Sequence, residues 1–342
     1  MIKKYTILNM LMVMSYFSIA QDIHFSQFDE TPLLLNPANV GVQHEIRAIA
    51  NYKSQWQSVN APFKTIAVSV DGRLLKNKKN HLGLGLNFFS DNAGEGQIKT
   101  NQVNLSVSGM VLLSKSSLVS AGLMAGYVQR SMNTAANSWS NQYDGMAYNA
   151  SRPSGEINQT ANFNFIDLAG GVQYSYGSNE MYMTANTARK LNIGVSVFHP
   201  HQPAYSFYGS NTKLYTKLVF HGDAAIGIKN SNIVLKPSYV IFIQGPTKEI
   251  TPGMLFQYLL QDASKYTAIK KFTAVSIGGY YRFKDAFIAV VKFEYNSFAL
   301  GFSYDVNLSK LRTVSSTRGG FEISLRYAFD TYRRGATTSR FY

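Results

Sequence analysis

Two neighbouring histidines are the side chains with the clearest potential for chemistry in this sequence. His199 and His201 flank Pro200, and imidazole is a frequent ligand of zinc. A protein metal site normally needs three or four convergent ligands, which two imidazoles alone do not supply. Because the proline turns the chain just past a predicted strand, the pair is predicted to open a loop, and we expect no metal ion there.

The other residue types that perform catalysis form no recognisable pattern. No G-x-S-x-G motif is present, and the chain has no cysteine, which excludes thiol catalysis, thiolate metal sites and lipidation of a cysteine. Gly83-Leu84-Gly85 and Gly278-Gly279 lie in predicted strands, without the helix that a phosphate-binding loop requires. We therefore expect no catalytic residue and no cofactor. An outer-membrane hydrolase stays open as an alternative, since barrel-shaped lipases and proteases exist.

The first 20 residues have the pattern of a cleaved signal peptide. Lys3 and Lys4 precede an apolar run from Ile7 to Phe17, and Ser18-Ile19-Ala20 places small residues where signal peptidase reads them. Cleavage is predicted before Gln21. No later stretch of about 20 apolar residues exists, so the exported chain is either soluble or a membrane β-barrel.

The composition favours the barrel. Charged residues make up only 15% of the chain, against about 25% in ordinary soluble domains, and there are 22 Tyr and 22 Phe. The net charge is +14. Nucleic acid is a poor partner for an exported protein, so anionic lipid head groups, an acidic partner or a generally basic surface remain as explanations.

Alternation of apolar and polar residues is the dominant pattern along the chain. In 102–111, Val103, Leu105 and Val107 share one face, whereas Asn104 and Ser106 share the other. About fourteen segments of this kind are predicted: 44–53, 64–73, 81–90, 98–112, 117–131, 163–177, 190–199, 213–228, 232–243, 250–261, 272–282, 285–295, 298–306 and 320–329. An even number of strands with almost no helix predicts an all-β fold, a single transmembrane antiparallel barrel.

The connections and termini complete the predicted organisation. If the first strand rises from the periplasm, the longest connection, 132–162, lies outside and most periplasmic turns are short, as in known barrels. Pro237 lies within a strand and is expected to mark a bulge. The predicted divisions are the signal peptide (1–20), a lead-in segment (21–43), the barrel (44–329) and a basic tail (330–342).

The lead-in segment is predicted to fold into or under the barrel as a plug, with a disordered lead-in as the alternative. Its two prolines and scattered apolar residues suggest an ordered extended stretch, and Leu33-Leu34-Leu35 argues against disorder. Several charges fall on the inferred lumen face, where they avoid the cost of about 2–4 kcal/mol that lipid exposure near the midplane would bring. They are Lys217, Asp223, Lys236, Lys292, Glu294, Glu322 and Arg326. Their mixed signs suggest paired networks that hold a plug or neighbouring strands, with a conduction pathway as the competing reading.

An ordered set of short motifs resembles one known family. It includes Asn36-Pro37-Ala38 up to Gly41, Tyr52-Lys53-Ser54-Gln55-Trp56, Ala61-Pro62-Phe63-Lys64-Thr65, His199-Pro200-His201-Gln202-Pro203 and Ser303-Tyr304-Asp305-Val306-Asn307. Together they resemble the PorP/SprF family of the type IX secretion system, over essentially the whole mature chain. His201 departs from the asparagine expected at that position.

This resemblance implies an integral outer-membrane accessory barrel without enzymatic activity. Its expected partners are secreted proteins that carry type IX C-terminal domains, notably gliding adhesins, together with periplasmic ring components and outer-membrane lipid. Asn36, Pro37 and Gly41 are expected to structure the plug. Partner contacts are expected from aromatic and neighbouring residues of the outer loops, because buried Trp and Tyr dominate interfaces: Trp56, Pro62, Phe63, Trp139, Tyr143, Tyr205, Phe207 and Tyr208. Membrane anchoring or loop packing is the alternative role for each of them, and a small-solute channel is the alternative function.

Overall fold

The computed structural model describes most of the chain between residues 22 and 329. The described ranges are 22–56, 62–76, 80–94, 96–133, 137–156, 160–178, 186, 189–209, 211–261, 271–309 and 317–329. The predicted signal peptide (1–20) and basic tail (330–342) lie outside the described residues. Within them, no helix is both long and apolar enough to cross a membrane.

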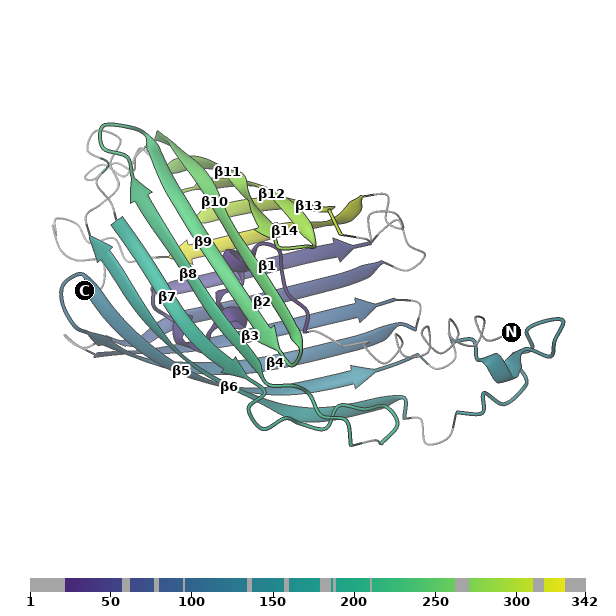
Figure 1. Ribbon diagram of the computed structural model, residues 1–342. Helices are drawn as coiled ribbons and strands as arrows, with labels where there is room; N and C mark the ends of the chain where they lie inside the picture. The colour runs from purple at the N-terminus through teal and green to yellow at the C-terminus, as the bar shows by residue number, and fades with distance from the viewer. Residues whose placement is uncertain are drawn as a thin grey trace, which may run out of the picture.

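Fourteen antiparallel strands form one closed barrel (Figure 1). They are β1 (Ile46–Gln55), β2 (Phe63–Lys76), β3 (Asn80–Ala93), β4 (Ile98–Leu112), β5 (Ser117–Ser131), β6 (Asn162–Ser178), β7 (Arg189–Phe198), β8 (Lys217–Gly227), β9 (Ile233–Gln244), β10 (Thr247–Gln261), β11 (Thr273–Arg282), β12 (Ala286–Tyr295), β13 (Phe298–Asn307) and β14 (Arg318–Phe329). Each strand pairs with its neighbours in sequence, and β1 closes the barrel on β14, from Ile46 opposite Phe329 to Gln55 opposite Gly320. The predicted barrel is confirmed.

The two faces of each strand differ in the way that lipid outside and a polar interior require. On β4, Val103, Leu105 and Val107 are 46%, 49% and 47% exposed, while the intervening Asn104 and Ser106 are buried. Apolar side chains therefore face outward, and the backbone polar groups of the wall pair from strand to strand, as a lipid environment demands.

The barrel has two rims, which we call proximal and distal. The proximal rim contains the start of β1 and the end of β14, whereas the distal rim contains the opposite ends of these strands. The predicted long connection, 132–162, joins β5 to β6 at the distal rim, where its described part extends well beyond the wall (Figure 1). The turn between β4 and β5, residues 113–116, lies at the proximal rim.

Two predicted details of the strands were wrong. Pro237 causes no bulge in β9: the register is the same on both sides of it, and only the pairing of Ala224 and Ala225 with this strand is interrupted. A proline lacks the N–H that a neighbour's carbonyl would accept, so pairs can be lost without inserting a residue. Strand β8 begins at Lys217 rather than 213, because Lys213 forms a bridge with Ala204 inside the preceding loop.

The residues before β1 lie inside the barrel. This N-terminal segment (residues 22–45) contains three short turns of helix, η2 (Phe28–Glu30), α2 (Pro32–Leu35) and η3 (Pro37–Asn39). They are the purple coils within the wall in Figure 1. Phe28 packs on Tyr280 of β11 with ring centroids 4.8 Å apart, and Val42 packs with Met110 and Leu118. The apolar core is therefore shared between this segment and the inner wall.

Candidate functional site

The N-terminal segment crosses the interior from the distal to the proximal rim. At the distal end, the backbone N–H of Asp22 donates to the side chain of Gln244, the last residue of β9, over 3.0 Å. At the proximal end, Val42 contacts the residues around the β4–β5 turn. The candidate site is therefore the interface between this segment and the inner wall, together with the loops of the distal rim.

Asn36 and Pro37 fix the middle of the segment. Pro37 opens η3, and the Asn36 side chain accepts a hydrogen bond from the N–H of Ala38 over 2.9 Å, which caps this turn. The Asn36 amide also donates to the carbonyl of Val172 over 3.0 Å and lies 3.1 Å from Nε2 of His221. One side chain thus both shapes the segment and ties it to β6 and β8.

Glycines on the inner wall leave room for the segment's backbone. A Cβ at Gly122 would lie 2.4 Å from the carbonyl carbon of Pro37, and one at Gly83 would lie 2.7 Å from the carbonyl oxygen of Val40. Neighbouring serines hydrogen-bond the carbonyls that this approach brings to the wall: the Ser120 hydroxyl donates to the carbonyl of Ala38 over 2.8 Å. Close approach with direct hydrogen bonding explains why small residues occupy these inward positions.

Gly41 ends this stretch with a backbone conformation that suits glycine. Its φ is +67°, and its N–H donates to the carboxylate of Asp71 over 2.9 Å. The same carboxylate binds Arg47 through two hydrogen bonds of 2.8 and 3.0 Å, with both side chains buried. Turning the chain into β1 therefore depends on a buried ion pair that also holds the glycine.

Glu30 is the centre of a buried charge cluster. It lies 3.0 Å from Lys292 and 3.0 Å from Arg326, while Asp29 also pairs with Lys292. Burial alone would raise the pKa of Glu30, but the charges of Arg326 and Lys292 lower it to about 2. The carboxylate consequently stays ionised and holds η2 against β12 and β14.

The remaining members of this cluster come from the wall. Glu294 lies 3.3 Å from Lys236 and 3.7 Å from Arg326, and it accepts a hydrogen bond from Gln257 over 2.9 Å. Glu322 has different partners, since it accepts hydrogen bonds from the backbone N–H groups of Ser26 and Gln27 over 2.7 and 3.0 Å. Of the seven charges predicted for the lumen, Lys292, Arg326 and Glu322 contact the segment, Glu294 bridges to Arg326, and Lys236 is linked to them through Glu294.

The other two lie on β8. Lys217 Nζ is 3.6 Å from Asp22 and 4.8 Å from the ring centroid of Phe242. Asp223 accepts a hydrogen bond from the Asn192 amide of β7 over 2.8 Å, a contact within the wall. Lys217 thus belongs to the distal anchor of the segment, and Asp223 joins two strands.

His199 sits between two carboxylates at the distal end of the lumen. Its Nε2 lies 2.8 Å from Asp22, and its Nδ1 lies 2.6 Å from Asp167 of β6. Burial tends to lower the pKa of His199, but the hydrogen bonds to Asp167 and Asp22 raise it to about 9. The imidazole is therefore a cation that fixes the start of the segment, while His201 reaches the carbonyl of Ile166 over 2.8 Å. In the described residues, no group of three or more His, Cys, Asp or Glu is placed to hold a metal ion.

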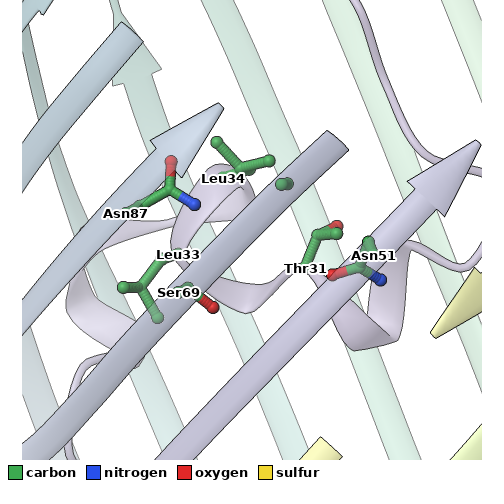
Figure 2. A pocket seen from close by; sticks show the side chains of 7 residues that line it. Thr31, Leu33, Leu34, Asn51, Ser69 and Asn87 are labelled. Carbon is green, nitrogen blue, oxygen red and sulfur yellow. The ribbon is translucent and has the colours of Figure 1, made fainter. Parts of the chain in front are cut away.

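Two small recesses lie beside the segment. One is lined by Thr31, Leu33 and Leu34 of the segment and by polar side chains of β1 to β3, among them Asn51, Ser69 and Asn87 (Figure 2). The other lies at the distal end between Asp22, His24, Lys217, Phe242, Gln244, Thr247 and Glu249. Both are bounded by the segment as well as by the wall.

Aromatic side chains predicted to meet partners lie in separate parts of the distal rim. Trp56 and Phe63 stack edge to face at 4.7 Å across the β1–β2 connection, with Pro62 half-buried beside Phe63 in the chain. Tyr205 and Phe207 surround the Arg130 guanidinium at 4.4 and 5.7 Å from their ring centroids. Tyr208 is 44% exposed. Trp139 and Tyr143 belong to the β5–β6 connection. The residues predicted to contact partners therefore lie in three separate loops of the distal rim.

The described tip of the β5–β6 connection is an ordered hairpin. Tyr143 and Tyr148 form a β-bridge, and the intervening turn is held by Asp144, whose carboxylate accepts hydrogen bonds from the N–H groups of Met146 and Ala147 over 2.8 and 2.7 Å. Gln142 links the hairpin base by accepting from the N–H of Trp139 over 3.1 Å. Tyr143 and Met146 are 56% and 94% exposed. The hairpin thus presents apolar surface from a fixed backbone.

Comparison with known proteins decides the family. The family model described as type IX secretion system membrane protein PorP/SprF matches residues 17–327. The chain belongs to the PorP/SprF family. This match confirms the resemblance, and the protein is a membrane barrel of a secretion system. PorP/SprF is not a known enzyme family.

Solved structures match this PorP/SprF protein over most of its length at low identity. The toluene transporter TbuX of Ralstonia pickettii is 12% identical over 88% of this chain and 94% of that chain, with a TM-score of 0.46. LpxR from Salmonella typhimurium is 8% identical over 82% of this chain and 100% of that chain, with a TM-score of 0.35. Among curated proteins, no sequence matches the chain.

The partners of the lumen charges were not predicted from the sequence. Asp22, Asp29 and Glu30 all lie in the lead-in segment, and their acidity next to a wall with basic inward positions was an available indication. The Arg47–Asp71 pair was also missed, although both residues lie at inward positions of neighbouring predicted strands.

Replacing Gly122 with alanine in this PorP/SprF protein is expected to displace the middle of the N-terminal segment from the inner wall. The new Cβ would meet the backbone of Pro37 at 2.4 Å, which no side-chain rotation relieves. We expect a loss of about 1–3 kcal/mol of stability, as for an overpacked core. Because the chain has no cysteine, Leu33→Cys provides a unique thiol whose maleimide labelling rate should rise.

Gly109→Ala is the matched control, since a Cβ there meets no atom within 4 Å in the described structure. Equal labelling rates for the Gly122→Ala and Gly109→Ala proteins would contradict the close packing of Pro37 on β5.

The distal anchor is expected to weaken at alkaline pH. The pKa of His199 is raised from its unfolded value of 6.5 to about 9, so its contribution to stability is complete below about pH 6.5 and is lost as the pH rises through about 9. Labelling of a cysteine introduced at Ile23 should accelerate between pH 7.5 and 9.5, measured with a thiol reagent corrected for thiolate formation. His199→Gln should remove this rise, whereas His201→Gln in the same loop should leave it; a rise that persists in His199→Gln would refute the assignment.

Proposed function

We propose that this protein holds a secreted protein at the outer membrane by binding its type IX C-terminal domain, and that gliding adhesins are among such partners. The observation that carries the proposal is the tethered N-terminal segment, which occupies the lumen along the barrel's length. A lumen occupied by the chain itself favours binding at the loops over transport through the interior.

The distal rim offers the chemistry that such a contact needs. Interface hot spots are rich in Tyr, Trp and Arg held on a rigid backbone. Tyr143 and Met146 stand exposed on the ordered hairpin, and Tyr208 stands exposed in the β7–β8 loop. The N–H of Thr160 donates to the carbonyl of Phe207 over 2.7 Å, which links the base of the β5–β6 connection to the middle of the β7–β8 loop. Their exposed residues therefore form our proposed contact surface.

The N-terminal segment is proposed to act as a plug. In this arrangement, residues 1–20 are a cleaved export signal, 21–43 close the barrel of residues 44–329, and the tail 330–342 follows β14 on the periplasmic side. The proximal rim would then face the periplasmic ring of the secretion system. The ion pairs of Asp22 with Lys217, and of Asp29 and Glu30 with Lys292, support this role, because they connect the segment to the wall at two places.

The first test is electrical and separates a plugged barrel from the alternative small-solute channel. Single-channel recording of the purified protein should show little steady conductance. Glu30→Gln should raise the frequency of opening, because Lys292 and Arg326 lose a charged partner in a buried setting. Asp144→Asn, an identical chemical change in the external hairpin, should have no effect. Large steady conductance of the wild-type protein would refute the plug.

The second test is recovery of the partner. Affinity purification from native outer membranes should recover proteins that carry a type IX C-terminal domain. Combined Tyr143→Ser and Tyr208→Ser should reduce this recovery about tenfold, in line with loss of one or two interface hot spots. Leu113→Ser, an exposed apolar residue of the proximal β4–β5 turn, should leave it unchanged. Recovery of no such protein by the wild type would contradict the proposed function.

A further inference from the structure

The outward faces of β2, β3 and β4 carry a short cationic row at the distal rim. Lys64 is paired with Asn92, and Asn92 is paired with Lys99, so the three side chains lie next to one another across the strands. All three are exposed. They point to the lipid side of the wall, because Lys64 shares its face with Val68 and Lys99 shares its face with Val103.

The next rows towards the barrel centre lose polarity in steps. The second row consists of the exposed Ile66 with Ser90 and Asn101, and these two polar residues are linked by a hydrogen bond of 2.8 Å from the serine hydroxyl. The third row is apolar and exposed, and consists of Val68, Phe88 and Val103. The order of a cationic row, a mixed row with two polar members and an apolar row matches the order of head group, interface and acyl chains in a lipid leaflet.

The row is a local feature rather than a property of the whole rim. The outward positions of the described parts of β2 to β6 include no Asp or Glu, so no carboxylate on that face opposes the two lysines. Beyond β1, the outward residues near the distal ends of β11 to β14 include four aromatic side chains, Tyr281, Phe287, Tyr304 and Phe321. Two kinds of membrane-interface contact therefore occupy different sectors of one rim.

We propose that Lys64, Asn92 and Lys99 bind the phosphate head group of a lipid in the surrounding leaflet. Two strand spacings place the lysine Cα atoms about 10 Å apart, a span that two long flexible side chains can close around a phosphate. Asn92 between them supplies a neutral amide donor. A lipid is the occupant because its acyl chains can lie on the apolar row in the same register, a contact that a free phosphate ion cannot make.

The experiment is a titration of the purified full-length protein with lipid A, a lipid that bears two phosphate groups, followed by native mass spectrometry. Combined Lys64→Gln and Lys99→Gln should weaken binding about tenfold, from the loss of two basic contacts at a membrane surface. Lys64→Arg with Lys99→Arg should retain binding, which shows that the loss follows from charge rather than from misfolding. Lys213→Gln with Lys284→Gln, two exposed lysines elsewhere on the rim, is the matched control.

Two further arms identify the source of the phosphate. Dephosphorylated lipid A should bind weakly and equally to all variants, and inorganic phosphate at millimolar concentration should not displace the phosphorylated lipid. Equal lipid affinity of the wild-type and double-glutamine proteins would overturn the proposal, as would full displacement by inorganic phosphate. The site does not depend on the proposed secretion partner, so either idea can fail alone.

Discussion

The structure depends on one electrostatic constraint: charges buried in the lumen need partners of opposite sign. Lys292 and Arg326 are inward side chains of a wall whose outside faces lipid, and an unpaired charge in such an interior is costly. Glu30 and Asp29 supply the opposite charges from outside the sheet. The N-terminal segment is therefore part of the electrostatic balance of the barrel: without it Lys292 would lose its partners Asp29 and Glu30, and Arg326 would keep only Glu294.

Charge alone would not fix the path of the N-terminal segment, which has no strands of its own. Its backbone contacts with the wall define that path. Glycines let the segment approach β3 and β5, and serine hydroxyls donate hydrogen bonds to its carbonyls. Asn36 shapes the turn that presents those carbonyls. Ion pairs at Asp22 and Glu30 then act on a segment whose path is already defined by hydrogen bonds, so the two kinds of contact reinforce each other.

The parts of this molecule that follow from local pattern were predictable from sequence, and the parts that follow from long-range pairing were not. Val103, Asn104 and Leu105 reveal a two-sided strand because successive side chains point to opposite faces. Nothing local in His199-Pro200-His201 indicates that His199 meets Asp22, 177 residues away in sequence. Pro237 was misjudged for a related reason: whether a lost N–H bends a strand depends on its neighbour, and Ala224 and Ala225 tolerate the unpaired positions. The predicted aromatic residues could be placed in their loops from sequence, but nothing local indicates that Tyr205 meets the guanidinium of Arg130.

The division between a filled interior and a varied exterior bears on how such a barrel can work. Because Lys217, Lys292 and Arg326 are engaged with the segment, few inward charges remain to guide a solute, whereas the distal loops carry exposed Tyr143, Met146 and Tyr208 on ordered backbones. A partner bound there would sit above a wall whose sectors meet the membrane differently, cationic on β2 to β4 and aromatic on β11 to β14. Such asymmetry would set a preferred rotation of the barrel relative to neighbouring lipids and proteins, since aromatic and basic side chains favour different depths and head groups. The orientation of a partner bound to these loops would then follow from the wall as much as from the loops.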